Sequence, residues 1–379
     1  MQPFTLLIKP SGSDCNIDCQ YCFYKARAPE IGQGKQRMSD EVLEKLIKDY
    51  MGLGFSMAGF SWQGGEPTLM GLDFYRKAVE LQKKYGKSGT EIGNALQTNG
   101  MLLDEKWCRF LAEAKFLVGI SIDGPKELHN RYRVDFAGKG TWDRVMRGLE
   151  NCREFGVKFN TLTLINNVTA GHPDELFDFF VEQKIQYLQF INCVELDPET
   201  GEVTDFSVGP EQYGDFLCRL FDRWFEYGPE KISIRDFDSI LSYYVTGRHT
   251  ICTFDRQCSQ YIVVEHDGDC FPCDFFVEPK WKLGNIFETP IEQIASSRKK
   301  RDFARGKQSL CNKCLICSCL AICRGGCMKH RVAVGGGNAA VESYFCQSYK
   351  RFIEYTMPRF MQLAAKVSSR QLNRSGSNG

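Results

Sequence analysis

The sequence predicts an α/β protein: a partial parallel (β/α)6 barrel of the TIM type, followed by a small cysteine-rich extension with a β-hairpin and a C-terminal helix. Short apolar runs alternate with amphipathic segments in the first part of the chain, as in a parallel sheet. Eleven of the eighteen cysteines then lie between Cys252 and Cys346. We therefore predict a barrel domain (residues 1–235), an extension (236–367) and a Ser/Gly/Asn-rich tail (368–379) that is disordered.

Six strands and six helices are expected in the barrel. The run from Phe116 to Ile122 is almost continuously apolar, as a strand buried on both faces requires. Polar motifs follow several strands, and active sites of parallel barrels lie at those ends. The expected strands are 4–9, 59–63, 91–98, 116–123, 157–165 and 187–192, and the expected helices are 39–51, 71–85, 104–114, 141–155, 173–183 and 211–227.

In the extension, Asp267-Gly268 separates two apolar runs, which is a strong hairpin signal. The second strand of this hairpin should deliver Cys273, and residues 348–365 should form a terminal helix. Asp274 follows Cys273 directly. A carboxylate there can act as a general base, although an aspartate at a strand end is more often a turn or surface group.

Composition limits the class of protein. The formal charge is +1 with acidic and basic residues nearly balanced, so we expect no nucleic-acid partner. No apolar run reaches membrane-spanning length and no signal peptide is present, so we expect a cytoplasmic protein without a membrane partner. In that reducing compartment, eighteen cysteines indicate metal ligands rather than disulfides.

The first motif that carries chemistry is Cys15-x3-Cys19-x2-Cys22, directly after the first strand. Three thiolates can hold three irons of a 4Fe-4S cluster and leave the fourth iron open, whereas electron-transfer clusters normally have four cysteine ligands. A zinc knuckle is the alternative, but it favours two or four soft ligands at C-x2-C spacing.

The second motif, Gln63-Gly64-Gly65-Glu66-Pro67, ends the second strand. Paired glycines let a ligand approach the backbone closely, and the Glu66 carboxylate offers an acceptor for an ammonium group. An ordinary strand-to-helix turn would be the alternative for an isolated Gly-Gly pair.

Together, the cysteine triplet and the Gly-Gly-Glu-Pro motif resemble the radical S-adenosylmethionine superfamily. The resemblance implies that Cys15, Cys19 and Cys22 bind the cluster to which S-adenosylmethionine is chelated, and that Glu66 holds the amino group. Arg133 would be the cation for the methionine carboxylate, although a solvated loop arginine is the alternative. The implied cofactor-binding set is Gln63, Gly64, Gly65, Glu66, Ser121, Arg133 and Val194.

A second cysteine group contains Cys314-x2-Cys317-x5-Cys323-x3-Cys327, preceded by Cys252, Cys258 and Cys273 and followed by Cys346. This layout is similar to the SPASM extension of radical enzymes that modify peptides and proteins. Eight thiolates are enough for two fully ligated 4Fe-4S clusters. A double zinc ribbon is the alternative, but it would leave no route for electrons. Cys270, Cys311 and Cys319 remain without an assigned role. The resemblance implies one auxiliary cluster on Cys252, Cys258, Cys273 and Cys327, and a second on Cys314, Cys317, Cys323 and Cys346.

A narrower resemblance, to the anaerobic sulfatase-maturating enzymes, covers about residues 4–362. It rests on segments that include 7–10, 22–24, 62–69, 96–100, 189–193, 233–235, 272–275 and 346–350. It implies that a cysteine or serine in a Cys/Ser-x-Pro/Ala-x-Arg motif of a nascent or unfolded sulfatase is oxidised to Cα-formylglycine after a 5′-deoxyadenosyl radical abstracts a Cβ hydrogen.

The same resemblance implies the cofactors and the remaining site residues. S-adenosylmethionine and three 4Fe-4S clusters are expected, with an electron donor such as flavodoxin or ferredoxin. Asp274 would be the catalytic base, and Tyr24 and Arg235 would bind the peptide. From their positions alone, Tyr24 and Arg235 would most often be packing and surface groups.

Two other functions fit parts of the pattern. Another SPASM enzyme that makes thioether or carbon-carbon cross-links, or epimerises residues, would share every cluster motif. Many peptide cyclases carry an N-terminal peptide-recognition domain, and we expect none here because the first strand begins by Phe4. A non-catalytic iron-sulfur or zinc scaffold is a different class, against which the intact Cys15, Cys19, Cys22 and Glu66 argue.

Overall fold

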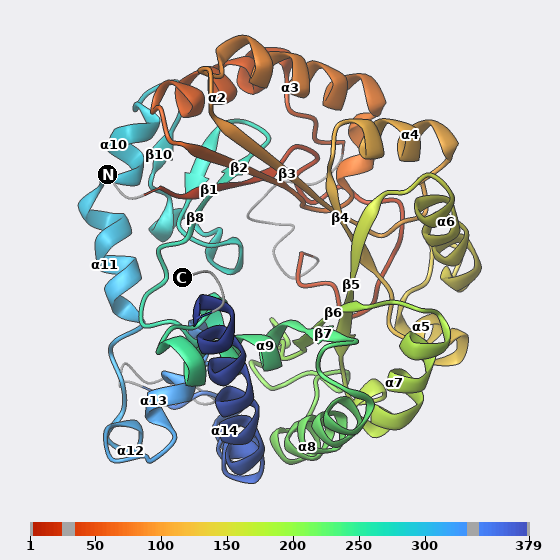
Figure 1. The fold of residues 1–379 in the computed structure, drawn as a ribbon. Coiled ribbons are helices and arrows are strands. Elements are labelled where there is room, and N and C mark those ends of the chain that lie inside the picture. Colours follow the sequence, from red (N-terminus) through yellow and green to blue (C-terminus); the bar gives the residue numbers. More distant parts are fainter. Residues whose placement is uncertain (1–2, 25–34, 332–340, 377–379) are drawn as a thin grey trace. The chain divides into compact units, whose positions relative to one another are not determined.

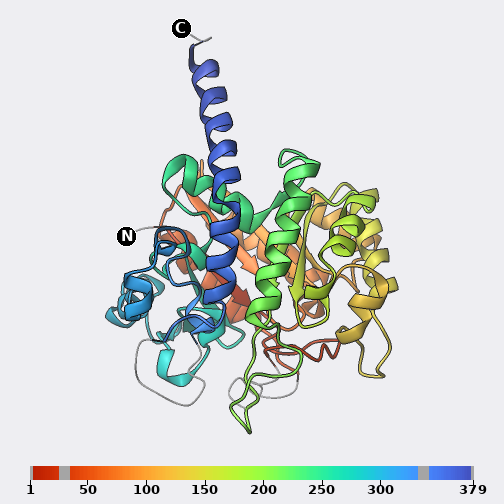
Figure 2. The same cartoon turned by 90° about the horizontal axis from the view of Figure 1, so that it is seen from below.

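The computed structural model describes residues 3–24, 35–331 and 341–376, with side chains to residue 369. The chain forms two compact units (Figures 1 and 2). The first consists of Met1–Ile122, Lys126–Thr161 and Cys258–Arg305, and the second of Asp123–Pro125, Leu162–Gln257 and Gly306–Gly379. The domain boundary at residue 235 remains a prediction.

The first unit is built on a sheet with the strand order β10-β9-β8-β1-β2-β3-β4. Strands β1 to β4 are parallel to one another, and β8 pairs in parallel with β1, with Lys9 opposite Glu265. The predicted hairpin is present as the antiparallel pair β8 and β9. It extends the barrel sheet, because its first strand adds to the edge of β1. The strands are β1 (Thr5–Lys9), β2 (Met57–Trp62), β3 (Glu91–Thr98), β4 (Leu117–Ser121), β8 (Tyr261–Glu265), β9 (Asp269–Phe271) and β10 (Gly284–Asn285).

Helices of the first unit bury one apolar face against this sheet. Helix α2 (Asp40–Gly52) begins at Ser39, whose side chain accepts a hydrogen bond from the Val42 amide at 3.2 Å. Helix α3 (Leu72–Tyr85) lies beside it along β1 to β3 (Figure 1). The other helices are α4 (Glu105–Glu113), α5 (Lys126–Tyr132), α6 (Trp142–Glu154), α10 (Ile291–Ala295) and α11 (Arg298–Gly306), whose last residue belongs to the second unit.

The second unit contains the parallel pair β6 (Tyr187–Asn192) and β7 (Ser233–Ile234). Its long helices pack through aromatic rings: the centroids of Phe221 and Phe360 lie 4.8 Å apart, between α8 and α14. Figure 2 shows α14 (blue) running beside α8 (green) and continuing beyond it. The helices are α7 (Pro173–Glu182), α8 (Pro210–Tyr227), α9 (Arg235–Thr246), α12 (Asn312–Leu315), α13 (Leu320–Cys323) and α14 (Cys346–Gly376), while β5 (Lys158–Ile165) passes from the first unit into the second.

The predicted fold class is confirmed. Strands and helices alternate as expected, each predicted barrel element lies within two residues of its predicted bounds, and the strand order begins at β10 and ends at β7, so the sheet is open. Helix α5, strand β7 and helix α9 were not predicted from the sequence. Helix α5 has seven residues and β7 has two, so neither is long enough to display a period.

The C-terminal helix was predicted, but it is longer than expected. Helix α14 continues to Gly376. Composition predicts a disordered tail from Ser368, so this prediction is wrong for residues 368–376. The helix continues for a local reason. Each residue added to an existing helix adds one hydrogen bond, and Arg370, Gln371 and Leu372 are good helix formers. None of the helices in the described part of the chain is both long and apolar enough to cross a membrane.

Candidate active site

The three cysteines of the first motif lie in a loop that is fixed on both sides. On one side, the Asp18 amide donates to the Val134 carbonyl at 2.7 Å and the Gln20 amide to the Tyr132 carbonyl at 3.0 Å. On the other, the Glu66 amide donates to the Asp14 carbonyl at 2.8 Å. Backbone hydrogen bonds to neighbouring segments therefore fix the position of this loop.

Gly64 and Gly65 allow the cysteine loop to pack against the end of β2. A Cβ atom on Gly65 would lie 2.1 Å from the Asp14 carbonyl oxygen, and one on Gly64 would lie 2.8 Å from the Gly12 carbonyl oxygen. Gly64 also has a φ of +132°, which side chains disfavour. The backbone that approaches these glycines so closely is the chain's own loop, which the sequence did not indicate.

Glu66 is fully buried and its carboxylate is oriented by hydrogen bonds from the chain. Oε1 accepts from the Thr98 hydroxyl at 2.7 Å and from the Thr68 amide at 3.0 Å, while Oε2 accepts from the Asn99 amide at 2.7 Å. Burial raises the pKa of Glu66 and these hydrogen bonds oppose that rise. One further acceptor position on Oε2 suits an ammonium group.

The cysteine loop suits a positively charged group such as an iron cluster. Burial, together with the nearby charges of Glu66, Cys19 and Cys22, raises the pKa of Cys15 to about 12. The thiolate forms of these cysteines would therefore need a cation beside them. Among the described residues, no three ligand side chains converge on a single metal ion. A four-iron cluster is larger, and its ligands stand farther apart.

Ser121 and Arg133 lie in the same unit as this loop. The Ser121 hydroxyl accepts from Gln97 Nε2 at 3.1 Å, at the ends of β4 and β3. The Arg133 side chain is buried, and its Nη1 donates to the hydroxyl of Tyr21 in the cysteine loop at 3.0 Å. A hydrogen bond therefore joins Arg133 to the cysteine loop. This position is compatible with its predicted role of binding the carboxylate of S-adenosylmethionine.

The predicted base lies beside the second motif. Gln63 Nε2 donates to Asp274 Oδ2 at 3.1 Å, although the two residues are 211 positions apart. The Tyr261 hydroxyl donates to the other carboxylate oxygen, Oδ1, at 3.4 Å. The Gln63–Asp274 contact brings the segment that contains Glu66 together with the residue that follows Cys273, a predicted auxiliary ligand.

Tyr24 is packed beside a buried ion pair that the sequence did not reveal. Lys9 Nζ lies 3.3 Å from Glu265 Oε1 and 4.8 Å from the centre of the Tyr24 ring. Burial raises the pKa of Glu265 and the charge of Lys9 lowers it. The pair follows from the register of β1 with β8, which places the two residues side by side, and that pairing had no local signal in the sequence.

Two predicted site residues lie in the second unit. Val194 is buried just after β6, and Arg235 begins α9. Arg235 is exposed, and its Nη1 donates to Gln189 Oε1 on β6 at 2.7 Å. This contact fixes the guanidinium over β6, while its other donors remain available to a ligand.

The four predicted ligands of the second auxiliary cluster are in the second unit, near one another. Burial raises the pKa of Cys314 to about 12, with further contributions from Cys311, Cys346 and Cys323. Cys317 likewise raises the pKa of Cys346. Cys311, which had no predicted role, lies with its sulfur 3.6 Å from that of Cys314. For the other cluster, Cys258 and Cys273 belong to the first unit, and Cys252 and Cys327 to the second.

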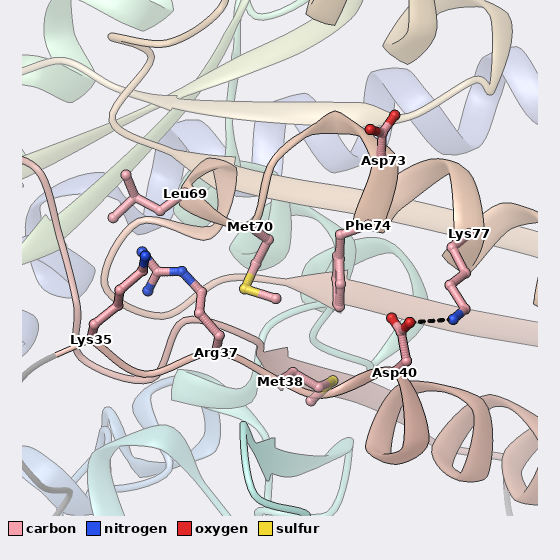
Figure 3. Close-up of a pocket in the computed structure, with 9 residues that line it drawn as sticks. All are labelled: Lys35, Arg37, Met38, Asp40, Leu69, Met70, Asp73, Phe74 and Lys77. Carbon is pink, nitrogen blue, oxygen red and sulfur yellow. Dashed lines mark ion pairs between the residues drawn. The ribbon is translucent and has the colours of Figure 1, made fainter.

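A pocket of about 550 Å³ lies near helix α3 of the first unit (Figure 3). Met70 and Phe74 contribute apolar walls, and Lys77 forms an ion pair with Asp40 at 2.6 Å. The nine residues that line the pocket include none of the predicted site residues. The candidate active site is therefore the cysteine loop and its surroundings rather than this pocket.

Comparison with known proteins identifies the family. Residues 10–180 match the radical SAM superfamily and residues 252–318 match SPASM, an iron-sulfur cluster-binding domain. The chain is 40% identical over 97% of its length to the whole of a cysteine-type anaerobic sulfatase-maturating enzyme from Clostridium perfringens. The chain belongs to the anaerobic sulfatase-maturating enzymes.

Other members of this family support the assignment. A serine-type anaerobic sulfatase-maturating enzyme from Bacteroides thetaiotaomicron is 37% identical, over 94% of this chain and 90% of that protein. The solved structure of native anSMEcpe with bound AdoMet and Cp18Cys peptide is 40% identical, with a TM-score of 0.89 over 96% of this chain and 100% of that chain. This chain is thus a radical SAM enzyme that uses S-adenosylmethionine and 4Fe-4S clusters, including auxiliary clusters, on a peptide substrate.

Proposed function

We propose that this enzyme oxidises a cysteine or serine in a Cys/Ser-x-Pro/Ala-x-Arg motif of a nascent or unfolded sulfatase to Cα-formylglycine. The observation that carries the proposal is the Gln63–Asp274 hydrogen bond at 3.1 Å. It joins a candidate base to the strand end that continues into Glu66. The relatives named as sulfatase-maturating enzymes, of both cysteine type and serine type, support the same reaction.

The cofactor residues have separate tasks in this proposal. Cys15, Cys19 and Cys22 would hold the open cluster, and Glu66 would accept a hydrogen bond from the amino group of S-adenosylmethionine. Arg133 would bind its carboxylate, and Ser121, Gln63, Gly64, Gly65 and Val194 would complete the cofactor-binding set. Bound there, the cluster and S-adenosylmethionine supply a 5′-deoxyadenosyl radical that removes a hydrogen atom from the substrate Cβ.

The chain must then manage one proton and one electron. After the hydrogen atom is lost, a cysteine substrate releases its thiol proton to Asp274 and one further electron, which gives a thioaldehyde. Water converts the thioaldehyde to the aldehyde and releases sulfide. We propose that the two auxiliary clusters would accept this electron. Their assigned ligands are Cys252, Cys258, Cys273 and Cys327 for the first, and Cys314, Cys317, Cys323 and Cys346 for the second.

Substrate binding is assigned to Tyr24 and Arg235. The Tyr24 ring is buried beside Lys9, so it presents a fixed apolar surface, and Arg235 offers donors to peptide carbonyl groups. We further propose that flavodoxin or ferredoxin donates the starting electron, and that the reaction takes place in the cytoplasm, where eighteen cysteines suit the reducing conditions.

Mass spectrometry of a defined peptide tests this function. The iron-reconstituted protein is incubated anaerobically with S-adenosylmethionine, a reductant and a peptide that contains Cys-x-Pro-x-Arg, or its Ser-x-Ala-x-Arg equivalent. We expect the mass of formylglycine together with 5′-deoxyadenosine, and neither with a Cys15→Ala variant. If the wild-type protein forms 5′-deoxyadenosine and a cross-linked or epimerised peptide instead, the alternative of another SPASM modification is correct.

A further inference from the structure

The hydroxyl of Tyr261 contacts two proposed site residues at once. It lies 3.4 Å from the sulfur of Cys273 and 3.4 Å from Oδ1 of Asp274. Cys273 is a predicted ligand of the first auxiliary cluster and Asp274 is the proposed base. When Cys273 is a thiolate, the hydroxyl is the donor to both groups, in a bifurcated hydrogen bond.

The ring of Tyr261 is anchored by the sheet rather than by a loop. Tyr261 is the first residue of β8, where it pairs with Thr5 of β1. Its ring packs against a buried cluster formed by Leu7, Val263, Phe271 and Val277. Because three of these four residues lie on paired strands, the position of the hydroxyl is set by strand register.

The Asp274 carboxylate is consequently held at both oxygens. Gln63 donates to Oδ2 at 3.1 Å and Tyr261 donates to Oδ1 at 3.4 Å. A carboxylate with both oxygens held keeps one orientation toward the substrate, and a base that must meet a single proton needs this precision. The Tyr261 hydroxyl is the donor in its contact with Asp274, so it orients the carboxylate.

Donation to the Cys273 sulfur has a second effect. A hydrogen bond to a ligand sulfur withdraws negative charge from the cluster and raises its reduction potential. We propose that Tyr261 is a positioning residue that orients Asp274 and raises the potential of the auxiliary cluster bound by Cys273. The inference rests on the proposed function, because it takes Asp274 as the base and Cys273 as a cluster ligand.

The Tyr261→Phe variant removes the hydroxyl and keeps the ring in its apolar cluster. In an EPR-monitored redox titration of the full-length reconstituted protein, we expect one auxiliary potential to become more negative while the other stays unchanged. Tyr85→Phe is the matched control, because it removes a tyrosine hydroxyl that bonds to Glu44 at 2.6 Å on another helix of the same unit. Unchanged potentials in Tyr261→Phe would overturn the inference that the Tyr261 hydroxyl raises the potential of the cluster bound by Cys273.

The second readout is the number of 5′-deoxyadenosine molecules formed per formylglycine. We expect this ratio to rise ~10-fold in Tyr261→Phe, because hydrogen abstraction continues while proton removal slows. A shifted potential with an unchanged ratio would overturn the inference that Tyr261 orients Asp274 as the base. If the wild-type protein makes no formylglycine at all, the proposed function fails, and the potential still decides whether Tyr261 acts on the cluster.

Discussion

At the scale of single residues, the site is defined by two carboxylates in different environments. Glu66 is fully buried and bonded to the amides of Thr68 and Asn99, so it is a fixed acceptor. Asp274 is only half-buried and is held by side-chain donors, which suits a group that gains and loses a proton. The two carboxylates therefore fit different roles although they are chemically alike.

Replacing the proposed base tests that division of roles. Asp274→Asn keeps the shape and an oxygen for the Gln63 contact but cannot accept a proton. We expect formylglycine formation to fall by ~10² or more, the typical contribution of general base catalysis, while 5′-deoxyadenosine still forms. Quantitative chromatography of both products checks this, with Asp73→Asn at an exposed helix position as the control. If the Asp274→Asn variant forms formylglycine at the normal rate, Asp274 is not the base.

A second residue-scale prediction concerns stability and pH. Lys300 is 6% exposed with its Nζ 5.0 Å from the centre of the Phe4 ring, and burial lowers its pKa to about 8. The charged form is therefore disfavoured in the folded state. The cost is full below pH 8 and fades as pH rises toward the ordinary lysine value near ~10.4.

Lys300→Met should raise the free energy of unfolding by ~1–3 kcal/mol at pH 7 and by less at pH 10. Urea unfolding at the two pH values measures both gains. The exposed Lys83→Met is the control, for which we expect no gain. An equal gain for Lys300→Met at both pH values would mean that improved packing, not the removed charge, stabilises the variant.

At the scale of elements, β2 and the cysteine loop depend on each other's backbone. The amides of Gly65 and Glu66 donate to the carbonyls of Gly12 and Asp14, both at 2.8 Å. A parallel sheet places such strand ends at one edge, and the glycines let the loop reach them. The end of β2 therefore helps to fix the position of the predicted cluster ligands, together with their own loop.

Gly65→Ala should disrupt this contact, since its Cβ would lie 2.1 Å from the Asp14 carbonyl oxygen. We expect reconstituted iron to fall by ~4 atoms per chain, one cluster, and 5′-deoxyadenosine formation to be lost. Gly93→Ala, where no atom lies within 4 Å of the added Cβ, is the matched control and should retain full iron. Circular dichroism checks that the Gly65→Ala variant is folded. A folded Gly65→Ala variant with full iron would contradict the dependence of the cysteine loop on the end of β2.

At the scale of the whole molecule, eighteen cysteines serve different purposes. Eleven are predicted cluster ligands, whereas Cys108 and Cys152 are buried in the first unit with their sulfurs 3.8 Å apart. Around the second auxiliary site, burial raises the pKa of Cys314 and of Cys346, and the neighbouring thiol of Cys323 contributes to both increases. Neighbouring thiols of this kind suit a cationic cluster.

Single cysteine replacements separate ligands from other thiols. We expect Cys323→Ala to lower reconstituted iron by ~4 atoms per chain, while Cys319→Ala, from the same segment, retains the wild-type amount. Iron analysis and the absorbance of the reconstituted proteins check both variants. Loss of a cluster from Cys319→Ala, with Cys323→Ala unaffected, would reverse the ligand assignment within this segment.

Much of this protein was predictable from its sequence because its signals are local. The period of apolar residues along a strand or helix follows from backbone geometry, so the barrel elements were found to within two residues. The spacing Cys15-x3-Cys19-x2-Cys22 likewise places three predicted ligands in one loop, and with the Gly-Gly-Glu-Pro motif it indicated the radical S-adenosylmethionine superfamily.

Only the tertiary structure decided which distant segments meet. The pairing of β8 with β1, the Lys9–Glu265 ion pair that results from it, and the Gln63–Asp274 hydrogen bond all join residues far apart in the chain. No local period encodes such contacts, because they depend on how complete elements pack. The sequence by itself thus determined the six predicted strands and six predicted helices of the barrel and the family, and it predicted the cluster ligands. Packing determined how the proposed base is held beside the cofactor motif.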